Sequence, residues 1–374
     1  VRPPYTDYLT KIIESPIAAE PRQGEWTIYD VAKVAGVSTN TVSKVLNKKP
    51  GVGIATRKRV EKIIKDVGFS PHIGARGLRA KQNACIGVAM PVPFEASPAS
   101  QSFLLWLFTL LYKVFSGPGE YVCFDLATLA PQVSVDYVRG LFAQLFKAFL
   151  LIGPLAVDDS RIRLIHNAGH PYLALGRLDA FPECSSATVD YVEGAYQSTR
   201  FLLERGHTRI AMLKAFEGYQ PGVERLRGYE KALNEAGVSM DPALIQNIQF
   251  GPKNVTVAVE ALLQDRSITA LIDASATEDG VSIREGLKLA GRDPEKNLEV
   301  VSWTYNKGVS VLHEEVAHLW LPVRESAEEG VSRLADWIYG RSEGPIKVLH
   351  QPVLEESVGE KEIEPPTRLF ESLD

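Results

Sequence analysis

The sequence predicts a small all-α headpiece followed by a larger α/β body that is built as two lobes. Basic residues concentrate near the N-terminus, in short stretches whose apolar residues recur at helical spacing. From about residue 85 onward, apolar segments alternate with amphipathic ones, which is typical of strands and helices in parallel sheets. The 374 residues suffice for two or three domains, and 45% hydrophobic with 23% charged residues is typical of a globular protein.

The headpiece is predicted to contain three helices. Thr27 can cap the first, which ends at Gly36, and Ser38 can cap a second short helix over residues 39–46. A third helix, over about residues 56–67, would close the core. The apolar residues expected to face inward are Ile28, Val31, Ala32, Ala35, Val42, Val45, Leu46, Val60, Ile63, Ile64 and Val67. The short connection after Gly36 fits a helix-turn-helix, whose second helix lies in the major groove of DNA.

The charge of the chain is unevenly distributed. The net charge of the whole chain is −5, yet the segment from Trp26 to Gln82 holds 12 lysines and arginines against three acidic residues. That local charge of +9 leaves −14 for the rest of the chain. Because neutralisation of phosphates supplies much of the affinity for DNA, a concentrated basic module suits a nucleic-acid partner. Charge alone leaves a merely solvated basic surface as the alternative.

Residues 27–38 read TIYDVAKVAGVS, and residues 41–47 read TVSKVLN. Both segments closely resemble the headpiece of the lactose/galactose repressor (LacI/GalR) family of transcription regulators. The same register continues without a gap through GLR at residues 77–79 to IGV at residues 86–88. The resemblance therefore covers roughly 60 residues and implies a sequence-specific DNA-binding regulator.

The resemblance also implies which headpiece residues contact DNA. Thr39, Asn40 and Lys44 match the positions that read bases, and their chemistry agrees: asparagine can pair with adenine, lysine can donate to guanine, and threonine can contact a thymine methyl. The side chains better suited to phosphate contacts are those of Tyr29, Ser38 and Thr41, together with the lysines.

Residues 70–83 are expected to form a hinge. Gly74 and Gly77 weaken any helix there by about 1 kcal/mol each, so we expect the segment to fold only with DNA and a partner hinge. In the family, the leucine at the position of Leu78 is a wedge inserted into the minor groove, and Arg79 follows it. Packing of Leu78 against the partner hinge is the alternative, and both roles can hold at once.

The body is predicted to contain two sets of strands and helices. The first lobe is expected to have strands at residues 85–90, 121–126, 149–152 and 172–175, with helices near residues 101–115, 135–146 and 161–168. The second is expected to have strands at residues 209–213, 270–273 and 299–302, with helices near residues 191–204, 223–236, 255–264 and 278–290. Ligands of such sheets bind near the carboxyl ends of the strands. This pattern resembles the periplasmic-binding-protein-like body of the same family.

Further short segments of the body match the family's sequence and imply an effector pocket. Arg225, in the sequence ERLRGY, matches an arginine that binds ligand hydroxyls or a carboxylate in the family. The alternative is that Arg225 forms an ion pair on the surface. The resemblance places Phe103 and Asp190 in the same pocket. Two usual polar partners are replaced, by Ala274-Ser275 and by Trp303-Thr304. Ser275 and Trp303 are then the pocket residues at those positions, and Trp303 either stacks on a sugar or simply packs. An uncommon effector, or none, is therefore expected.

The sequence argues against other classes of protein. It contains no phosphate-binding glycine loop, His/Cys cluster or convincing triad, so we expect no enzyme, no cofactor and no metal site. His207 fits a structural turn before a strand, and the three cysteines are widely separated. A transport-associated sugar-binding protein would need export, and neither a signal nor a membrane span is visible. The expected location is the cytoplasm, in association with the nucleoid.

The expected domain plan has five parts: an N-terminal extension at residues 1–25, a helix-turn-helix domain at 26–69, a hinge at 70–83, an effector-binding and dimerisation domain at 84–358, and an acidic tail at 359–374. We expect a repressor, with an activator left open, that binds a palindromic operator in double-stranded DNA as a homodimer, with a tetramer also left open. Its effector would be a small polar molecule such as a sugar or sugar derivative. The alternative is a ligand-independent regulator with a degenerate pocket.

Overall fold

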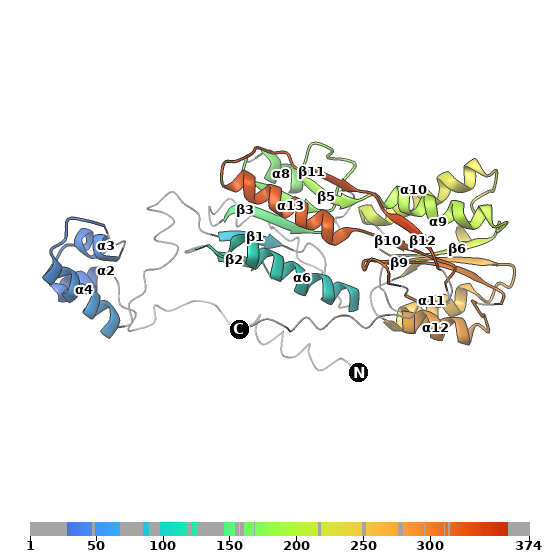
Figure 1. Cartoon of the computed structure of the whole chain (residues 1–374), viewed down its shortest axis with the longest axis horizontal. Coiled ribbons are helices and arrows are strands. Elements are labelled where there is room, and N and C mark those ends of the chain that lie inside the picture. Colours follow the sequence, from blue (N-terminus) through green and yellow to red (C-terminus); the bar gives the residue numbers. More distant parts are fainter. Residues whose placement is uncertain are drawn as a thin grey trace. The chain divides into compact units, whose positions relative to one another are not determined.

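The computed structural model describes residues 28–46, 49–67, 85–89, 98–117, 121–125, 146–153, 157, 161–167, 169–215, 218–248, 252–275, 280–294, 296–309, 311–312 and 315–357. The chain divides into two compact units, residues 1–82 and 83–374 (Figure 1). The predicted N-terminal extension, hinge and acidic tail lie outside the described residues, as do Thr27 and most of the helix predicted near residues 135–146.

Three helices form the described part of the first unit: α2 (Ile28–Ala35), α3 (Thr39–Leu46) and α4 (Ile54–Asp66). Their buried core consists of Val31, Ala32, Ala35, Val42, Val45 and Val60. Gly36 follows α2 with a φ of 61°, a left-handed conformation that glycine adopts without strain. Ser38 caps α3, because its Oγ accepts a hydrogen bond from the Thr41 N–H at 3.2 Å. The predicted three-helix headpiece and the capping role of Ser38 are confirmed, although α4 begins at Ile54 rather than near Thr56.

The first lobe of the second unit is a parallel sheet in the order β11-β5-β4-β3-β1-β2. Its strands are β1 (Cys85–Ala89), β2 (Tyr121–Asp125), β3 (Phe146–Ile152), β4 (Tyr172–Leu175), β5 (Ser186–Val189) and β11 (Lys347–His350). Helices α6 (Pro98–Phe115) and α13 (Val323–Ile338) pack on one face, and α8 (Arg161–Asn167) packs on the other. Phe146, which was predicted to end a helix, instead begins β3.

The second lobe is a sheet in the order β12-β10-β9-β8-β6-β7, parallel except for the antiparallel pair of β10 and β12. Its strands are β6 (Ile210–Ala215), β7 (Ile245–Ile248), β8 (Ala270–Ala274), β9 (Glu299–Thr304), β10 (Ala317–Trp320) and β12 (Val353–Glu356). Its helices are α9 (Tyr191–Glu204) and α10 (Gln220–Glu235) on one face, α11 (Pro252–Leu262) and α12 (Gly280–Leu289) on the other, with a 3-10 turn, η2 (Pro242–Leu244), before β7.

The central strands are apolar because both faces of each sheet are covered. Along β3, Ala148 and Leu150 pack with α6 and α13, whereas Phe149 and Leu151, at the alternating positions, pack with α8. All four side chains are fully buried. Burial of each larger side chain stabilises the fold by about 1.5–3 kcal/mol. Because both faces of β3 are buried, its residues 148–152 form a continuous apolar run and do not alternate between apolar and polar residues.

The chain passes between the two lobes more than once. After β10 it returns to the first lobe as α13 and β11, and it then crosses to the second lobe as β12, the last strand of the described residues. Gly330 makes the return possible, since a Cβ at this position would lie 2.6 Å from the Cβ of Ala187 on β5. No element after residue 302 was predicted from the sequence, and strands β5 and β7 were not predicted either. Those strands are short, and β11 alternates exposed and buried positions at a sheet edge.

Candidate nucleic-acid interface and effector site

Helix α3 has one apolar side and one polar side. Val42 and Val45 are buried in the headpiece core, while Asn40 is exposed and Thr39 and Lys44 are half-buried. The predicted base-reading residues therefore share the side of α3 that the core leaves open. This arrangement follows from the helical period, because the buried positions are three residues apart.

The residues predicted to contact phosphates lie around the same helix. Ser38 is exposed just before α3, and its Oγ lies 3.0 Å from Oγ1 of Thr41. Tyr29 is 67% exposed at the start of α2. On α4, Arg57 is half-buried and donates to the carbonyl oxygen of Lys49 at 2.7 Å, which fixes the α3–α4 loop. The exposed basic residues of α4 are Lys58, Arg59, Lys62 and Lys65.

Two predicted DNA-binding residues, Leu78 and Arg79, lie outside the described residues. Their roles stay predictions. The same holds for the whole predicted hinge.

The predicted effector residue Arg225 lies in an arginine cluster formed by Tyr191, Arg225, Asp273 and Trp303. Arg225, on α10, is fully buried, so a surface ion pair does not describe it. Its guanidinium lies over the ring of Tyr191, 4.9 Å from the centroid, and over Trp303 at 5.3 Å. The two rings are stacked with centroids 6.5 Å apart. A guanidinium held against aromatic faces gains cation–π attraction, which is stronger away from water.

Asp273 adds a carboxyl group to the arginine cluster at the end of β8. Its Oδ1 accepts hydrogen bonds from the Ser275 N–H at 3.1 Å and from the Ser275 hydroxyl at 2.6 Å. Burial raises the pKa of Asp273 to about 6, while the hydrogen bonds from Ser275 and the charge of Arg225 oppose this rise. Asp273 was not predicted as a site residue, although an acidic residue at the end of an apolar strand is a signal that the sequence contains.

Trp303 is 1% exposed, and its Nε1–H donates to the Ser198 hydroxyl at 3.1 Å. Its indole therefore packs inside the second lobe, against α9. Asp190 caps α9, because its Oδ1 accepts from the Glu193 N–H at 3.0 Å. Phe103 packs with Trp106 on the first-lobe core. The structure thus brings Arg225 and Trp303 together and joins Ser275 to them through Asp273, whereas no contact of Phe103 with this cluster is seen among the described residues. The effector roles of these residues stay predictions.

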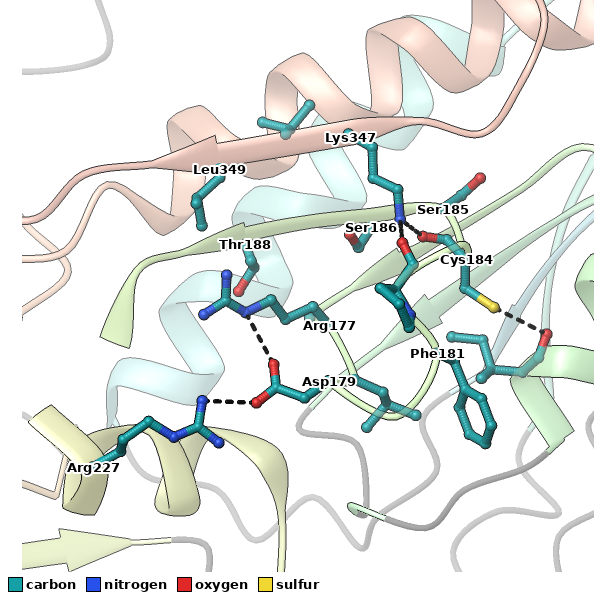
Figure 2. Close-up of a pocket in the computed structure, with 15 residues that line it drawn as sticks. Arg177, Asp179, Phe181, Cys184, Ser185, Ser186, Thr188, Arg227, Lys347 and Leu349 are labelled. Atoms are coloured by element: carbon teal, nitrogen blue, oxygen red, sulfur yellow. Dashed lines mark hydrogen bonds and ion pairs between the residues drawn. The ribbon is translucent and has the colours of Figure 1, made fainter. Parts of the chain in front are cut away.

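Two interlobe ion pairs join the loop after β4 to α10. Arg177 Nε lies 2.7 Å from Glu224 Oε1, and Arg227 Nη1 lies 2.8 Å from Asp179 Oδ2. Gln220 also donates to Glu224, at 3.1 Å. Figure 2 shows Arg177, Asp179 and Arg227 converging from the two lobes.

Glu224 is the buried member of the interlobe ion pairs, at 1% exposed. Its burial raises the pKa of its carboxyl group, whereas the hydrogen bond and charge of Arg177 lower it. No role was predicted for Glu224 from the sequence, because its partner Arg177 lies 47 residues away along the chain.

His207, which was predicted to have a structural role, contacts side chains on both sides of its ring. Its Nδ1 lies 2.9 Å from the Thr269 hydroxyl and its Nε2 lies 3.0 Å from Glu299. Glu299 also pairs with Arg205. The predicted structural role of His207 is therefore confirmed.

The described residues contain no group of three or more His, Cys, Asp or Glu side chains that could hold a metal ion. None of their helices is both long and apolar enough to cross a membrane.

Comparisons with known proteins agree with this geometry. The family "Bacterial regulatory proteins, lacI family" matches residues 27–72, and "Periplasmic binding proteins and sugar binding domain of LacI family" matches residues 127–330. The second match alone covers more than half of the chain. The HTH-type transcriptional regulator CelR of Thermobifida fusca is 27% identical over 328 residues, which cover 86% of this chain and 95% of that protein.

Solved structures are similar over the same length. A complex of the transcriptional regulator CelR with cellobiose has 26% identity and a TM-score of 0.59, covering 88% of this chain and 98% of that one. The lac repressor dimer bound to operator and the anti-inducer ONPF has the same fold, with a TM-score of 0.66 at 21% identity, covering 88% and 97%. The chain belongs to the LacI family of bacterial regulatory proteins: it is a transcription regulator that joins a helix-turn-helix DNA-binding domain to a periplasmic-binding-protein-like ligand-binding domain.

Proposed function

We propose that this chain is a repressor that binds a palindromic operator as a homodimer, in the cytoplasm and in association with the nucleoid. The observation that carries the proposal is the polar side of α3, which presents Asn40, Thr39 and Lys44 above a closed apolar core. An exposed polar helix of this kind, next to the basic α4, suits the major groove of DNA.

The proposed division of roles follows the chemistry of the side chains. Asn40 and Lys44 read base edges, with Thr39 against a thymine methyl or a phosphate. Tyr29, Ser38 and Thr41 hold phosphates and so fix the register of α3 on the duplex. Leu78 and Arg79 act from the hinge, at the minor groove.

The proposed domain plan assigns DNA binding to residues 26–69, a hinge to 70–83, and effector binding and dimerisation to 84–358. Residues 1–25 and 359–374 flank these domains without an assigned role.

An exposed apolar patch on the first lobe supports the homodimer. Leu105, Phe108 and Tyr112 recur on one side of α6 and are 71%, 40% and 72% exposed. Tyr121 and Phe124 on the neighbouring β2 extend the patch, and the Phe124 ring lies 4.8 Å from that of Phe108. Apolar patches of this kind mark association surfaces. A second copy of the chain would bring a second headpiece, as a palindromic operator requires. Sedimentation equilibrium would separate a dimer from a tetramer.

The proposed effector is a small polar molecule, such as a sugar or sugar derivative, bound at the arginine cluster. Arg225 and Asp273 together offer a cation and a carboxyl group in a buried setting, which suits hydroxyl recognition. The relative whose structure contains cellobiose shows that a similar chain can take a sugar.

The second candidate function is that of a ligand-independent regulator. It is favoured by the contacts that the Arg225 guanidinium already makes within the arginine cluster. Tyr191 and Trp303 already enclose the Arg225 guanidinium, and the interlobe ion pairs already join the lobes. A thermal-shift screen of sugars, sugar acids and nucleosides, on wild type and Arg225→Ala, separates the two candidates. An effector should stabilise wild type only, and then change operator affinity by about 5 to 150-fold, which corresponds to about 1–3 kcal/mol of coupling.

Selection of bound sequences from a random DNA pool tests the DNA-binding proposal. We expect a palindrome with a central step that is easily kinked. A pool that shows no enrichment would refute the proposal.

A further inference from the structure

A lateral pocket of about 520 Å³ lies where the loop after β4 covers β5 and β11 of the first lobe, and Arg227 on α10 of the second lobe completes its lining (Figure 2). The residues that matter for its chemistry are Arg177, Asp179, Ser186, Thr188, Arg227 and Lys347. Arg225, Asp273 and Trp303 of the arginine cluster do not line it. Its volume falls within the range of about 300–1,000 Å³ that is usual for small-molecule sites.

The strand register explains why polar side chains meet in the lateral pocket. Alternate residues of a strand point to the same face, so Ser186 and Thr188 of β5 both point into the pocket. On β11, Lys347 pairs with Ser186, and Leu349 pairs with Thr188. An ammonium group and two hydroxyl groups are thereby placed along the inner wall that these two strands form (Figure 2).

Several hydrogen-bond donors of the lateral pocket remain available. Among the described residues, the Ser186 hydroxyl has no hydrogen-bond partner, and the Thr188 hydroxyl makes only a long contact of 3.4 Å with the Val189 carbonyl oxygen. Arg177 uses its Nε for Glu224, and its two terminal nitrogens have no hydrogen-bond partner in the described part of the chain. These donors are therefore free to meet an acceptor that is not part of the chain.

The charge of the lateral pocket favours an anion. Its wall holds three cations and one carboxylate: Asp179 pairs with Arg227 at 2.8 Å, and Arg177 pairs with Glu224, which does not line the pocket. Lys347 is the cation of the wall with no carboxylate at ion-pair distance in the described part of the chain. The Lys347 ammonium donates to the backbone carbonyl oxygens of Pro182 and Cys184, which fix its position without neutralising its charge. Fixed cations with hydroxyl donors nearby are what phosphate and carboxylate groups require.

We propose that the lateral pocket is a second ligand site, which binds a small organic anion through Lys347, Arg177 and the hydroxyls of Ser186 and Thr188. The recognised group is a phosphate monoester or a carboxylate on a small polyol. This site is separate from the arginine cluster and does not depend on an effector binding there.

Isothermal titration of the full-length chain with glucose 6-phosphate, gluconate and neutral glucose tests the proposal. We expect an anion to bind in preference to glucose, and the stronger of the two anions identifies the recognised group. Ser186→Leu should fill the pocket, and Lys347→Met should remove its fixed charge. Each should weaken anion binding by at least about tenfold, as loss of a charge-assisted contact does. Thr188→Val, which keeps the shape of the side chain, should weaken it less.

Matched controls are Ser239→Leu and Lys288→Met, at exposed positions that do not line the pocket. Both should bind the anion as wild type does, and all five variants should retain the wild-type affinity for a DNA operator. If Ser186→Leu or Lys347→Met fails to fold, Thr188→Val carries the test. The proposal is overturned if wild type binds neither anion, if glucose binds equally well, or if every variant of Ser186, Thr188 and Lys347 that folds binds the anion with unchanged affinity.

Discussion

The headpiece and the arginine cluster differ in the burial of their polar side chains. On α3, Asn40 is exposed and Lys44 is partly so, and the buried residues only hold the helix in place. In the arginine cluster, Arg225, Trp303 and Asp273 are all buried and contact one another or their neighbours. The first region leaves its polar side chains accessible to a large partner. The second already has internal partners, so any ligand must compete with them.

We expect the largest effect on operator affinity from a polar substitution in the core of the headpiece. Val42→Asn should abolish specific operator binding, by about a thousandfold or more, because an amide without partners destabilises so small a core. Val34→Asn, at a position 58% exposed on α2, is the control and should change affinity little. Gel-shift titration gives the affinities. The thermal transition of the body should be the same in both variants, and a loss of the body transition in Val42→Asn would show that the two units do not fold independently.

The interlobe ion pairs test whether buried polar contacts stabilise the body more than exposed ones do. Glu224→Ala should lower the free energy of unfolding of the body by about 3 kcal/mol, because it leaves a cavity and removes the partner of Arg177. Glu204→Ala removes a surface ion pair with Arg200 on α9 and should leave the free energy of unfolding nearly unchanged. Urea unfolding measures both. Equal effects would mean that the Arg177–Glu224 pair is no stronger than a solvated one.

Asp273 gives a test with a defined pH window. Its pKa is raised from 3.8 to about 6, so its contribution to the free energy of unfolding is greatest below about pH 4 and is lost as the pH rises through 6. The difference between wild type and Asp273→Asn should therefore shift by up to about 3 kcal/mol, in favour of the variant, between pH 4 and pH 7.5.

Asp265 is the matched control, because hydrogen bonds from Ser267 and Arg209 hold its pKa down, at about 2. Its contribution is lost only as the pH falls from about 4 through 2. Asp265→Asn should therefore show no such shift between pH 4 and pH 7.5. A pH-independent difference for Asp273→Asn would show that this carboxyl group keeps its ordinary pKa in the folded chain.

The sequence was informative where structure is local. The Ser38 cap, the glycine after α2 and the inward-facing valines of the headpiece could all be predicted from one short segment, because the helical period fixes which residues share a side. Strands β1, β4 and β8 were predicted because both of their faces are buried. By contrast, α13 and β11 return to the first lobe after more than 100 residues, and no local pattern encodes that return.

The candidate effector site was predictable only in part, for the same reason. Arg225 could be identified from its surrounding sequence, but its contacts with Tyr191 and Trp303 depend on three separate elements, α9, α10 and β9. The Arg177–Glu224 pair joins residues from both lobes and could not be inferred from either segment alone.

Operator affinities of Lys44→Ala and Lys58→Ala test the central claim, that α3 reads sequence while the basic α4 supplies charge. The measurement is a titration of the selected operator and its single-base variants at several salt concentrations. Lys44→Ala should cost about 1–3 kcal/mol at one base pair and relax the preference there. Lys58→Ala should weaken all sequences alike and reduce the salt slope by about one unit. If the two variants weaken every sequence equally and show the same salt dependence, α3 does not read the bases.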